Sequence, residues 1–302
     1  MNQHRNNTFS ETLNDNKISR LIEEAILEDI GMGDITTEAT VSPEAFGRGE
    51  ILVKEQGIIA GLEVASMVFR HVDPEMQFQS KIMEGSPVEK GTIVAVIEGS
   101  LHGILKGERT ALNFLQRMSG IATLTHKFVD AVKGTKARIT DTRKTVPGLR
   151  IVDKLAVKIG EGINHRFGLD DMVLVKDNHI VAAGGITSAI EQCHVYLSQK
   201  SYIVKVEVET KNLSEVKEVL QLQGVDRIML DNFSIDEMRK AVQIINNKIE
   251  VEASGNVSLA TVRAIAETGV DFISIGALTH SPKALDISLD LVPVSPGTYR
   301  PS

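Results

Sequence analysis

The second half of the chain alternates strands with helices at a nearly constant spacing, and this rhythm constrains the fold more than any other feature. Four short apolar runs begin at residues 203, 227, 249 and 272, which lie 22 to 24 residues apart, and amphipathic segments separate them. With two earlier runs, six strands are predicted, at Arg138–Asp141, Met172–Lys176, Ile203–Glu209, Arg227–Asp231, Ile249–Ala253 and Phe272–Gly276. Strands that alternate with helices in this way are parallel and form either a barrel or a doubly wound sheet. Because no GxGxxG fingerprint follows the first of these strands, a dinucleotide-binding sheet is disfavoured.

Two serines mark expected helix starts in this half. Ser234 and Glu237 have the spacing of a capping box, and Ser258 precedes apolar residues at helical spacing that begin with Leu259. The sequence therefore predicts a helix after the fourth strand and another after the fifth.

The first half has a mixed pattern. Apolar residues at helical spacing predict one helix over Ile18–Ile30 and another from about Lys106 to Val132. Short apolar or alternating runs predict strands at Glu50–Glu55, Met76–Ile82 and Thr92–Ile97. Residues 1–120 are therefore predicted to form a domain of helices and sheet, with a frayed start of about 15 residues.

Composition narrows the classes of function. The formal net charge of −7 disfavours a general nucleic-acid binder or a protein bound to a membrane surface. The single cysteine, Cys193, excludes an intrachain disulfide framework and a cysteine-based metal site. No apolar run reaches the roughly 18 residues that span a bilayer, and the polar start MNQHRNNTFSETLNDNK lacks the apolar core of a signal peptide. A cytoplasmic protein is therefore expected.

Basic side chains gather where the predicted strands end, which is where β/α barrels carry their chemistry. The set comprises Arg143 and Lys144 after the first barrel strand, His165 and Arg166 before the second, and Lys176 at its end. Several cations at one barrel mouth in an acidic protein favour an anionic ligand, because such a ligand offsets their mutual repulsion. Guanidinium groups bind carboxylate or phosphate with two hydrogen bonds. The alternative, a solvated face paired with nearby acids, is the better interpretation for any one of them but not for the set.

Two acids end the third and fourth strands of the barrel. The carboxylates of Glu209 and Asp231 can hold Mg²⁺, which keeps part of its water and bridges to substrate phosphates. They can instead stabilise positive charge that develops on a sugar carbon. The alternative is a structural pairing with Lys176 or Lys205.

Small residues end the last two strands. They are Ser254, Gly255 and Asn256 after the fifth strand, and Gly276, Ala277 and His280 after the sixth. Small side chains let backbone N–H groups approach a phosphate, and the loops after the late strands of a barrel often bind one. Either glycine motif alone is weak, since glycine serves turns everywhere.

The order of motifs resembles the quinolinate phosphoribosyltransferase family, also called carboxylating nicotinate-nucleotide pyrophosphorylases. The resemblance covers about Ile18 to Leu291 in the family's order. Its motifs are ERTALN from Glu108, QRMSGIAT from Gln116, DTRKT from Asp141 with PGLR from Pro147, NHR from Asn164, DNH from Asp177, LDNF from Leu230 and GALTH from Gly276.

The resemblance implies an α/β fold of type II phosphoribosyltransferases. It implies an N-terminal α/β sandwich domain over 1–120, an incomplete β/α barrel over 121–280, and a C-terminal segment over 281–302 that packs back on the first domain. It also implies a homodimer or a higher oligomer, in which the first domain of one subunit covers the barrel mouth of the other. The implied reaction joins quinolinate to 5-phosphoribosyl-1-pyrophosphate with Mg²⁺, and gives nicotinate mononucleotide, pyrophosphate and CO₂ in de novo NAD biosynthesis.

The resemblance also implies roles for single residues. Arg143, His165, Arg166 and Lys176 would hold the quinolinate carboxylates, and Arg109 would reach them from the partner subunit. Lys144 would lie between the two substrates, and Glu209 and Asp231 would face the ribose and the metal. Lys144, Lys176, Glu209 and Asp231 would act in catalysis, while Ser254, Gly255, Asn256, Gly276, Ala277 and His280 would bind the sugar phosphate.

Two positions depart from the family pattern. Gly160-Glu161-Gly162 replaces a run of three glycines, and Val146 replaces a hydroxyl residue. A carboxylate from Glu161 inside the pocket would oppose a dianionic ligand. Two other classes of function stay open at this point: a paralogue on the same scaffold that acts on another ligand, and a binding protein that kept the fold without the activity.

Overall fold

The computed structural model describes the backbone of residues 3–292 and the side chains of residues 16–292. The chain divides into two compact units. One comprises the residues up to Leu124, Val146–Gly160 and the segment from Ser281 onward, and the other comprises Thr125–Thr145 and Glu161–His280. The long helix α4 (Leu101–Ala131) begins in the first unit and ends in the second.

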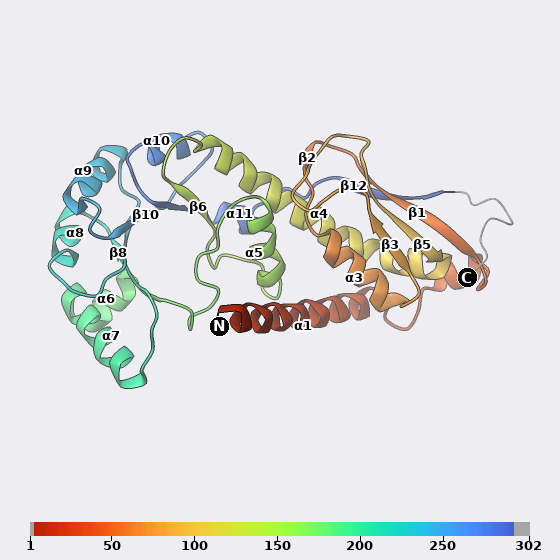
Figure 1. Cartoon of the computed structure of the whole chain (residues 1–302), viewed down its shortest axis with the longest axis horizontal. Coiled ribbons are helices and arrows are strands. Elements are labelled where there is room, and N and C mark those ends of the chain that lie inside the picture. The colour runs from red at the N-terminus through yellow and green to blue at the C-terminus, as the bar shows by residue number, and fades with distance from the viewer. Residues whose placement is uncertain (1–2, 293–302) are drawn as a thin grey trace. The chain divides into compact units, whose positions relative to one another are not determined.

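The first unit is built on a four-stranded antiparallel sheet in the order β12-β1-β5-β3 (Figure 1). Its strands are β1 (Phe46–Val53), β3 (Gln77–Ser80), β5 (Ile93–Ser100) and β12 (Ile287–Val292), and a small pair is formed by β2 (Gly57–Ile58) and β4 (Pro87–Val88). Every second residue of β1 is buried, as expected for a strand with one face on a core. The helices of this unit are α1 (Gln3–Ile30), α2 (Ile35–Thr40), α3 (Leu62–Val72), the first part of α4, and α5 (Arg150–Ile159).

The C-terminal segment was expected to pack back on the first domain. Strand β12 pairs with β1 from Arg48↔Val292 to Val53↔Ile287, so residues 287–292 form an edge of the antiparallel sheet. Residues 293–302 lie outside the described part of the chain.

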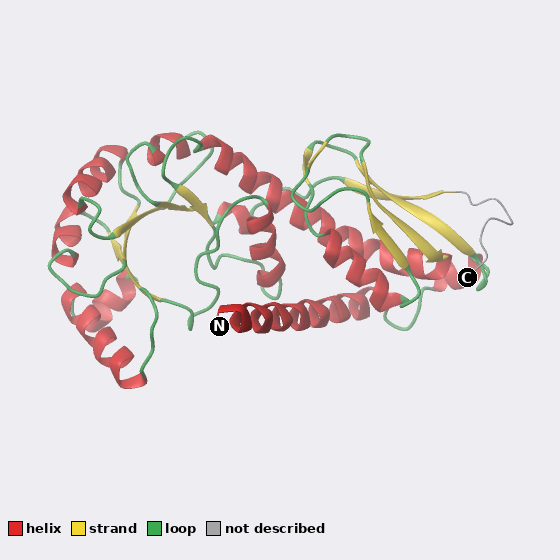
Figure 2. Ribbon diagram, viewed as in Figure 1, coloured by secondary structure: helices red, strands yellow, loops and turns green. Residues whose placement is uncertain are grey.

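The second unit is an incomplete β/α barrel. Six parallel strands follow the order β6-β11-β10-β9-β8-β7, so that β6 and β7 are the two outer strands. They are β6 (Arg138–Thr140), β7 (Val173–Val175), β8 (Val206–Thr210), β9 (Arg227–Asp231), β10 (Glu250–Ser254) and β11 (Phe272–Ser274). Figure 2 shows the strands as a curved inner layer with helices on its outer side. Those helices are α6 (Asp177–Ala183), α7 (Ile186–Lys200), α8 (Leu213–Val219), α9 (Ile235–Ile245), α10 (Val262–Ala266) and α11 (Ala277–His280).

All six barrel strands predicted from the apolar runs are present, and so is the capping box. Ser234 accepts the N–H of Glu237, and the carboxylate of Glu237 accepts the N–H of Ser234. In the connection between β6 and β7, Ile163 forms a parallel bridge with Thr140, the last residue of β6. This bridge places the residues after Ile163 beside the end of β6.

Several element boundaries differ from the sequence-based prediction. Helix α4 starts at Leu101 rather than at about Lys106, and β1 covers Phe46–Val53 rather than Glu50–Glu55. Helix α1 starts at Gln3 rather than at Ile18, although the side chains of residues 1–15 lie outside the described part. Helix α10 starts at Val262 rather than after Ser258, because residues 258–261 form a turn closed by the N–H of Thr261 on the carbonyl of Ser258.

Helix α5, which follows the predicted cut at residues 120–121, groups with the first unit. The guanidinium of Arg117 on α4 donates two hydrogen bonds of 2.7 Å to the buried carboxylate of Asp153 on α5. This bidentate pair ties α5 to α4. No helix in the described part of the chain is long and apolar enough to cross a membrane.

Candidate active site

A cavity of about 820 Å³ lies at the carboxyl ends of the barrel strands. Its lining includes most of the predicted site residues: Arg143, Lys144, His165, Arg166, Lys176, Glu209, Asp231, Ser254, Gly255, Asn256, Gly276, Ala277 and His280. Because parallel strands all deliver their carboxyl ends to one edge, residues far apart in the sequence meet here.

The strand order divides this cavity by charge. The basic residues follow or precede the outer strands β6 and β7, whereas the acids and small residues end the central strands β8, β9, β10 and β11. The cavity therefore presents a cationic side at the open seam of the barrel and an acidic side with small residues along its continuous sheet.

Two guanidinium groups dominate the cationic side. Burial, and then the charge of Arg143, lower the pKa of Arg166. The Nε of Arg143 is buried and has no hydrogen-bond partner among the described residues, while Nη1 of Arg166 donates to the carbonyl of Met172 at 3.1 Å. Two close guanidiniums with spare donors form a site for an anion with planar oxygen pairs.

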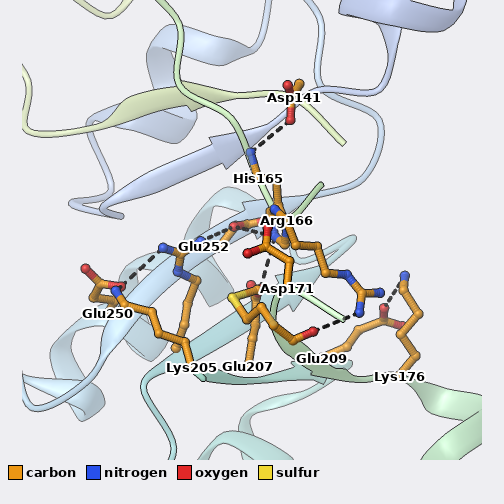
Figure 3. A network of polar contacts seen from close by, with 12 residues as sticks. Asp141, His165, Arg166, Asp171, Lys176, Lys205, Glu207, Glu209, Glu250 and Glu252 are labelled. Carbon is orange, nitrogen blue, oxygen red and sulfur yellow. Dashed lines mark hydrogen bonds and ion pairs between the residues drawn. The ribbon is translucent and has the colours of Figure 1, made fainter. Parts of the chain in front are cut away.

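On the acidic side, the structural pairing considered for Glu209 is present. Lys176 donates to the Glu209 carboxylate at 3.1 Å (Figure 3). Lys205, the other suggested partner, pairs instead with Glu250 at 3.1 Å. The Lys176–Glu209 pair joins the cationic side of the cavity to the acidic side.

Glu209 and Asp231 fit a divalent cation by position and chemistry. Glu209 is level with Met229 in the register of β8 and β9, and Asp231 lies two residues beyond Met229, so both carboxylates point to the same face. Both line the cavity, and hard carboxylate oxygens together with water suit Mg²⁺. Because Lys176 donates to one oxygen of the Glu209 carboxylate, the other oxygen is left to bind a metal ion.

His165 lines the cavity, and its side chain is buried in a network of polar contacts. Its Nε2 lies 3.0 Å from Glu207 and 3.4 Å from Glu252, and its backbone N–H donates to Asp141 at 2.8 Å (Figure 3). Burial lowers the pKa of His165, but the hydrogen bonds and charges of the two glutamates outweigh it and raise the pKa to about 9. The Nδ1 of the same ring accepts the N–H of Arg166 at 2.8 Å, which requires an unprotonated Nδ1. We expect the glutamates to prevail, because charge-assisted hydrogen bonds are about twice as strong as neutral ones.

Both ring nitrogens of His165 thus face protein groups. The predicted contact of His165 with a substrate carboxylate stays a prediction. Its side chain is only 5% exposed.

The two glutamates below His165 are balanced by cations. Nη1 of Arg227 pairs with Glu252 at 3.0 Å, and the Arg227 guanidinium stacks over Phe272 at 3.7 Å from the ring centre. The ligand atoms of His165, Glu207 and Glu252 lie within 4.8 Å of one another, close enough to share a metal ion. Because His165 and Arg227 already match the two carboxylates in number, we interpret the cluster as an ion-pair network that needs no ion.

The loop after β11 contacts the loop after β6. The hydroxyl of Thr279 donates to the carbonyl of Lys144 at 2.8 Å. A Cβ on Gly276 would lie 2.9 Å from Cδ of Lys144 and 3.1 Å from Cδ2 of His280, so glycine lets both side chains lie close to this loop. The aliphatic part of Lys144 is thereby held against the predicted phosphate loop.

Arg109 and Val146 belong to the first unit, and Glu161 belongs to the second unit but is not among the residues that line the cavity. Arg109 is on α4, with its side chain 58% exposed and its nearest acid, Glu108, at 4.0 Å. Glu161 adopts a left-handed φ of 68° and pairs with His126 at 3.4 Å, so its carboxylate does not oppose an anion in the cavity. Val146 is 40% exposed.

Sequence reasoning missed Glu207, Glu252, Arg227 and Asn232. A signal for the glutamates is present, because VEVET and EVEAS alternate acids with apolar residues within predicted buried strands. Acids at every second position of such a strand point to one face, which here is the barrel interior.

Comparison with known proteins decides between the open classes. The profile described as "Quinolinate phosphoribosyl transferase, N-terminal domain" matches residues 34–119, and the profile for the C-terminal domain of the same family matches residues 121–290. The chain belongs to the quinolinate phosphoribosyltransferase family.

Curated members of this family resemble the chain over nearly its whole length. The chloroplastic carboxylating nicotinate-nucleotide pyrophosphorylase of Arabidopsis thaliana is 48% identical over 289 residues, which are 91% of this chain and 82% of that protein. A probable nicotinate-nucleotide pyrophosphorylase (carboxylating) of Synechocystis is 47% identical over 275 residues, which are 90% of this chain and 91% of that protein.

Solved structures of family members share the fold. NadC from Streptococcus pyogenes superposes with a TM-score of 0.87 at 38% identity, over 92% of this chain and 97% of that one. The nicotinate-nucleotide pyrophosphorylase from Francisella tularensis gives a TM-score of 0.87 at 39% identity over the same shares. The sandwich domain and the incomplete barrel expected of the family are therefore confirmed.

Proposed function

We propose that the chain is a quinolinate phosphoribosyltransferase, which converts quinolinate and 5-phosphoribosyl-1-pyrophosphate into nicotinate mononucleotide, pyrophosphate and CO₂ for NAD biosynthesis. The observation that carries the proposal is the division of one cavity into a cationic side for a dicarboxylate and an acidic side, lined with small residues, for a sugar phosphate. Family membership supports the same assignment.

Quinolinate binds on the cationic side. Its two adjacent carboxylates relieve the repulsion between Arg143 and Arg166, and Lys176 adds a third cation. Planar guanidinium groups bind carboxylates with defined geometry and so direct the pyridine nitrogen toward the acidic side.

The sugar carbon that is attacked lies on the acidic side. As pyrophosphate leaves, positive charge grows on the ribose, and the carboxylates of Glu209 and Asp231 stabilise it. Lys144, held beside the Gly276 loop, offsets the charge of the departing pyrophosphate. Glu209 and Asp231 would also hold Mg²⁺, which supplies additional positive charge for the diphosphate.

Decarboxylation follows from the chemistry of the first product. Once its nitrogen carries the ribose, the ring is positively charged and accepts the electron pair of the adjacent carbon–carboxylate bond as CO₂ leaves. That carbon then takes up a proton. This step needs a ring held in place more than it needs a dedicated base.

Release of labelled CO₂ tests the proposed function. Carboxyl-labelled quinolinate is expected to lose CO₂ only when the protein, phosphoribosyl pyrophosphate and Mg²⁺ are all present. Nicotinate, which has one carboxylate, serves as the control for nucleotide formation without decarboxylation. Absence of release from folded protein would overturn the proposal and favour a paralogue with another ligand.

We further propose that the protein acts as a homodimer in the cytoplasm, with Arg109 contributing to the site of the partner subunit. The support is the side chain of Arg109, which is 58% exposed. The plant relatives are named chloroplastic or mitochondrial, so the cellular location of this chain is tested by fractionation.

Subunit mixing tests the role of Arg109. At a quinolinate concentration near the wild-type KM, an Arg109→Ala protein and an Arg143→Ala protein are each expected to lose most of their activity. If Arg109 acts across an interface, mixed dimers contain one intact site, and mixing restores about a quarter of the activity at statistical exchange, since half of the dimers are mixed. Mixtures no more active than their components would contradict this arrangement.

A further inference from the structure

Asn232, which directly follows β9, has a backbone conformation that few residues tolerate. Its φ is 58°, in the left-handed region that asparagine enters more readily than other non-glycine residues. Its N–H donates to the carbonyl of Ser254 at 2.9 Å, so the residue continues the β9–β10 pairing beyond the strand. The side chain is exposed toward the cavity, whose lining includes Asn232.

The Asn232 amide uses both of its ends within the site. Its Nδ2 donates to Oδ2 of Asp231 at 2.9 Å, and its Oδ1 accepts from Nδ2 of Asn256 at 3.0 Å. One side chain therefore connects the predicted ribose and metal carboxylate on β9 to the predicted phosphate turn after β10. A donor on one oxygen of Asp231 restricts the rotation of that carboxylate.

Gly255 makes room for this bridge. A Cβ at Gly255 would lie 2.1 Å from Oδ1 and 2.6 Å from Cγ of Asn232, closer than atoms can approach. Gly255 also has a φ of 94°, which favours glycine. The glycine in the phosphate turn therefore serves the Asn232 bridge as well as any backbone approach to a ligand.

We propose that Asn232 is a positioning residue that holds the Asp231 carboxylate and the turn Ser254–Asn256 as one unit, and thereby sets the affinity for phosphoribosyl pyrophosphate. This inference rests on the proposed function for the identity of the ligand. The dicarboxylate side lies at the outer strands β6 and β7, neither of which pairs with β9, so we expect its affinity to be independent of Asn232.

The Asn232→Asp variant separates these two affinities. Aspartate keeps the size, the tolerance of positive φ and the acceptor for Asn256, but it loses the donor to Asp231 and places a second carboxylate against it. We expect the Kd for phosphoribosyl pyrophosphate with Mg²⁺ to rise about 10- to 100-fold, the effect of losing a charge-assisted hydrogen bond. The Kd for phthalate is expected to change by less than about twofold. Phthalate has the two adjacent carboxylates but no ring nitrogen, so it occupies the dicarboxylate side without reacting.

Asn247 supplies the matched control. It has the same φ of 58° but lies in the turn before β10, away from the cavity lining. Asn232→Ala and Asn247→Ala each place alanine at a φ of 58°, so the two variants have the same conformational cost. Calorimetric titration of both variants with phosphoribosyl pyrophosphate therefore distinguishes the effect of backbone strain from the effect of losing the bridge. We expect only Asn232→Ala to weaken binding of phosphoribosyl pyrophosphate. Should Asn232→Asp fail to fold, Asn232→Gly removes both hydrogen bonds of the bridge and keeps a residue that tolerates a positive φ, and we expect the same selective loss.

The outcomes distinguish a failure of the proposed function from a failure of the positioning role of Asn232. Wild-type protein that binds no phosphoribosyl pyrophosphate would refute the proposed function itself. Wild-type binding with equal affinities in the Asn232 and Asn247 variants would overturn the positioning role alone. Equal losses for phosphoribosyl pyrophosphate and phthalate would also overturn it, because they would indicate a general disturbance of the cavity.

Discussion

Replacing Arg143 with alanine is expected to raise the KM for quinolinate about 10- to 100-fold, while the fold and the KM for phosphoribosyl pyrophosphate stay nearly unchanged. Losing one charge-assisted contact to a carboxylate typically costs about 1.5–3 kcal/mol, which corresponds to this range. The guanidinium of Arg143 is available for such a contact, because its buried Nε has no hydrogen-bond partner among the described residues. Steady-state kinetics with each substrate varied in turn measure the two KM values.

The matched control is Arg239→Ala. Arg239 is an exposed arginine on α9 whose partner is Asp236, one turn away on the same helix. Its loss removes the same charge and side chain from the barrel without touching the cavity, so both KM values should stay unchanged. A normal quinolinate KM in Arg143→Ala would refute the assignment of this guanidinium to a substrate carboxylate.

Replacing Glu209 with glutamine is expected to lower kcat about 100- to 1,000-fold with a smaller change in quinolinate affinity. Removing one group that stabilises developing charge has an effect of this size. Glutamine is nearly isosteric and can still accept the hydrogen bond from Lys176, so the variant removes the negative charge and keeps the contact. If Glu209 also holds Mg²⁺, the Mg²⁺ concentration needed for half-maximal activity should rise.

Glu191→Gln serves as the control for Glu209→Gln, since Glu191 is an exposed acid on the outer helix α7. It should leave kcat and the Mg²⁺ dependence unchanged. A kcat of Glu209→Gln close to that of the control would show that the acid serves only to pair with Lys176.

The Lys176–Glu209 pair gives one structural link between the two substrate sides. Removing the charge of Glu209 also leaves Lys176 without its anionic partner, so a modest gain in quinolinate affinity is expected in Glu209→Gln. Such a gain together with a low kcat would separate binding from catalysis within one variant.

The amino-acid sequence by itself determined the elements of the barrel and the end at which its chemistry lies. The apolar runs that begin 22 to 24 residues apart correspond to strands β8, β9, β10 and β11. Since parallel strands place all their carboxyl ends at one edge, polar residues after each run had to meet there. The capping box at Ser234 was equally predictable, because its two hydrogen bonds join residues three apart.

Only the tertiary structure decided which partner each charge takes. Lys176 follows β7 and His165 precedes it, and both pair with glutamates of β8. The periodicity of one strand gives a face and an end but no distance to residues outside that strand. For the same reason, the sequence placed His165 among the cations that bind the substrate, whereas in the structure both of its ring nitrogens face protein groups. The bridge from Asn232 to Asp231 and Asn256 depends on a left-handed turn that fits only against Gly255 of the neighbouring loop, a contact that exists once β9 and β10 lie side by side.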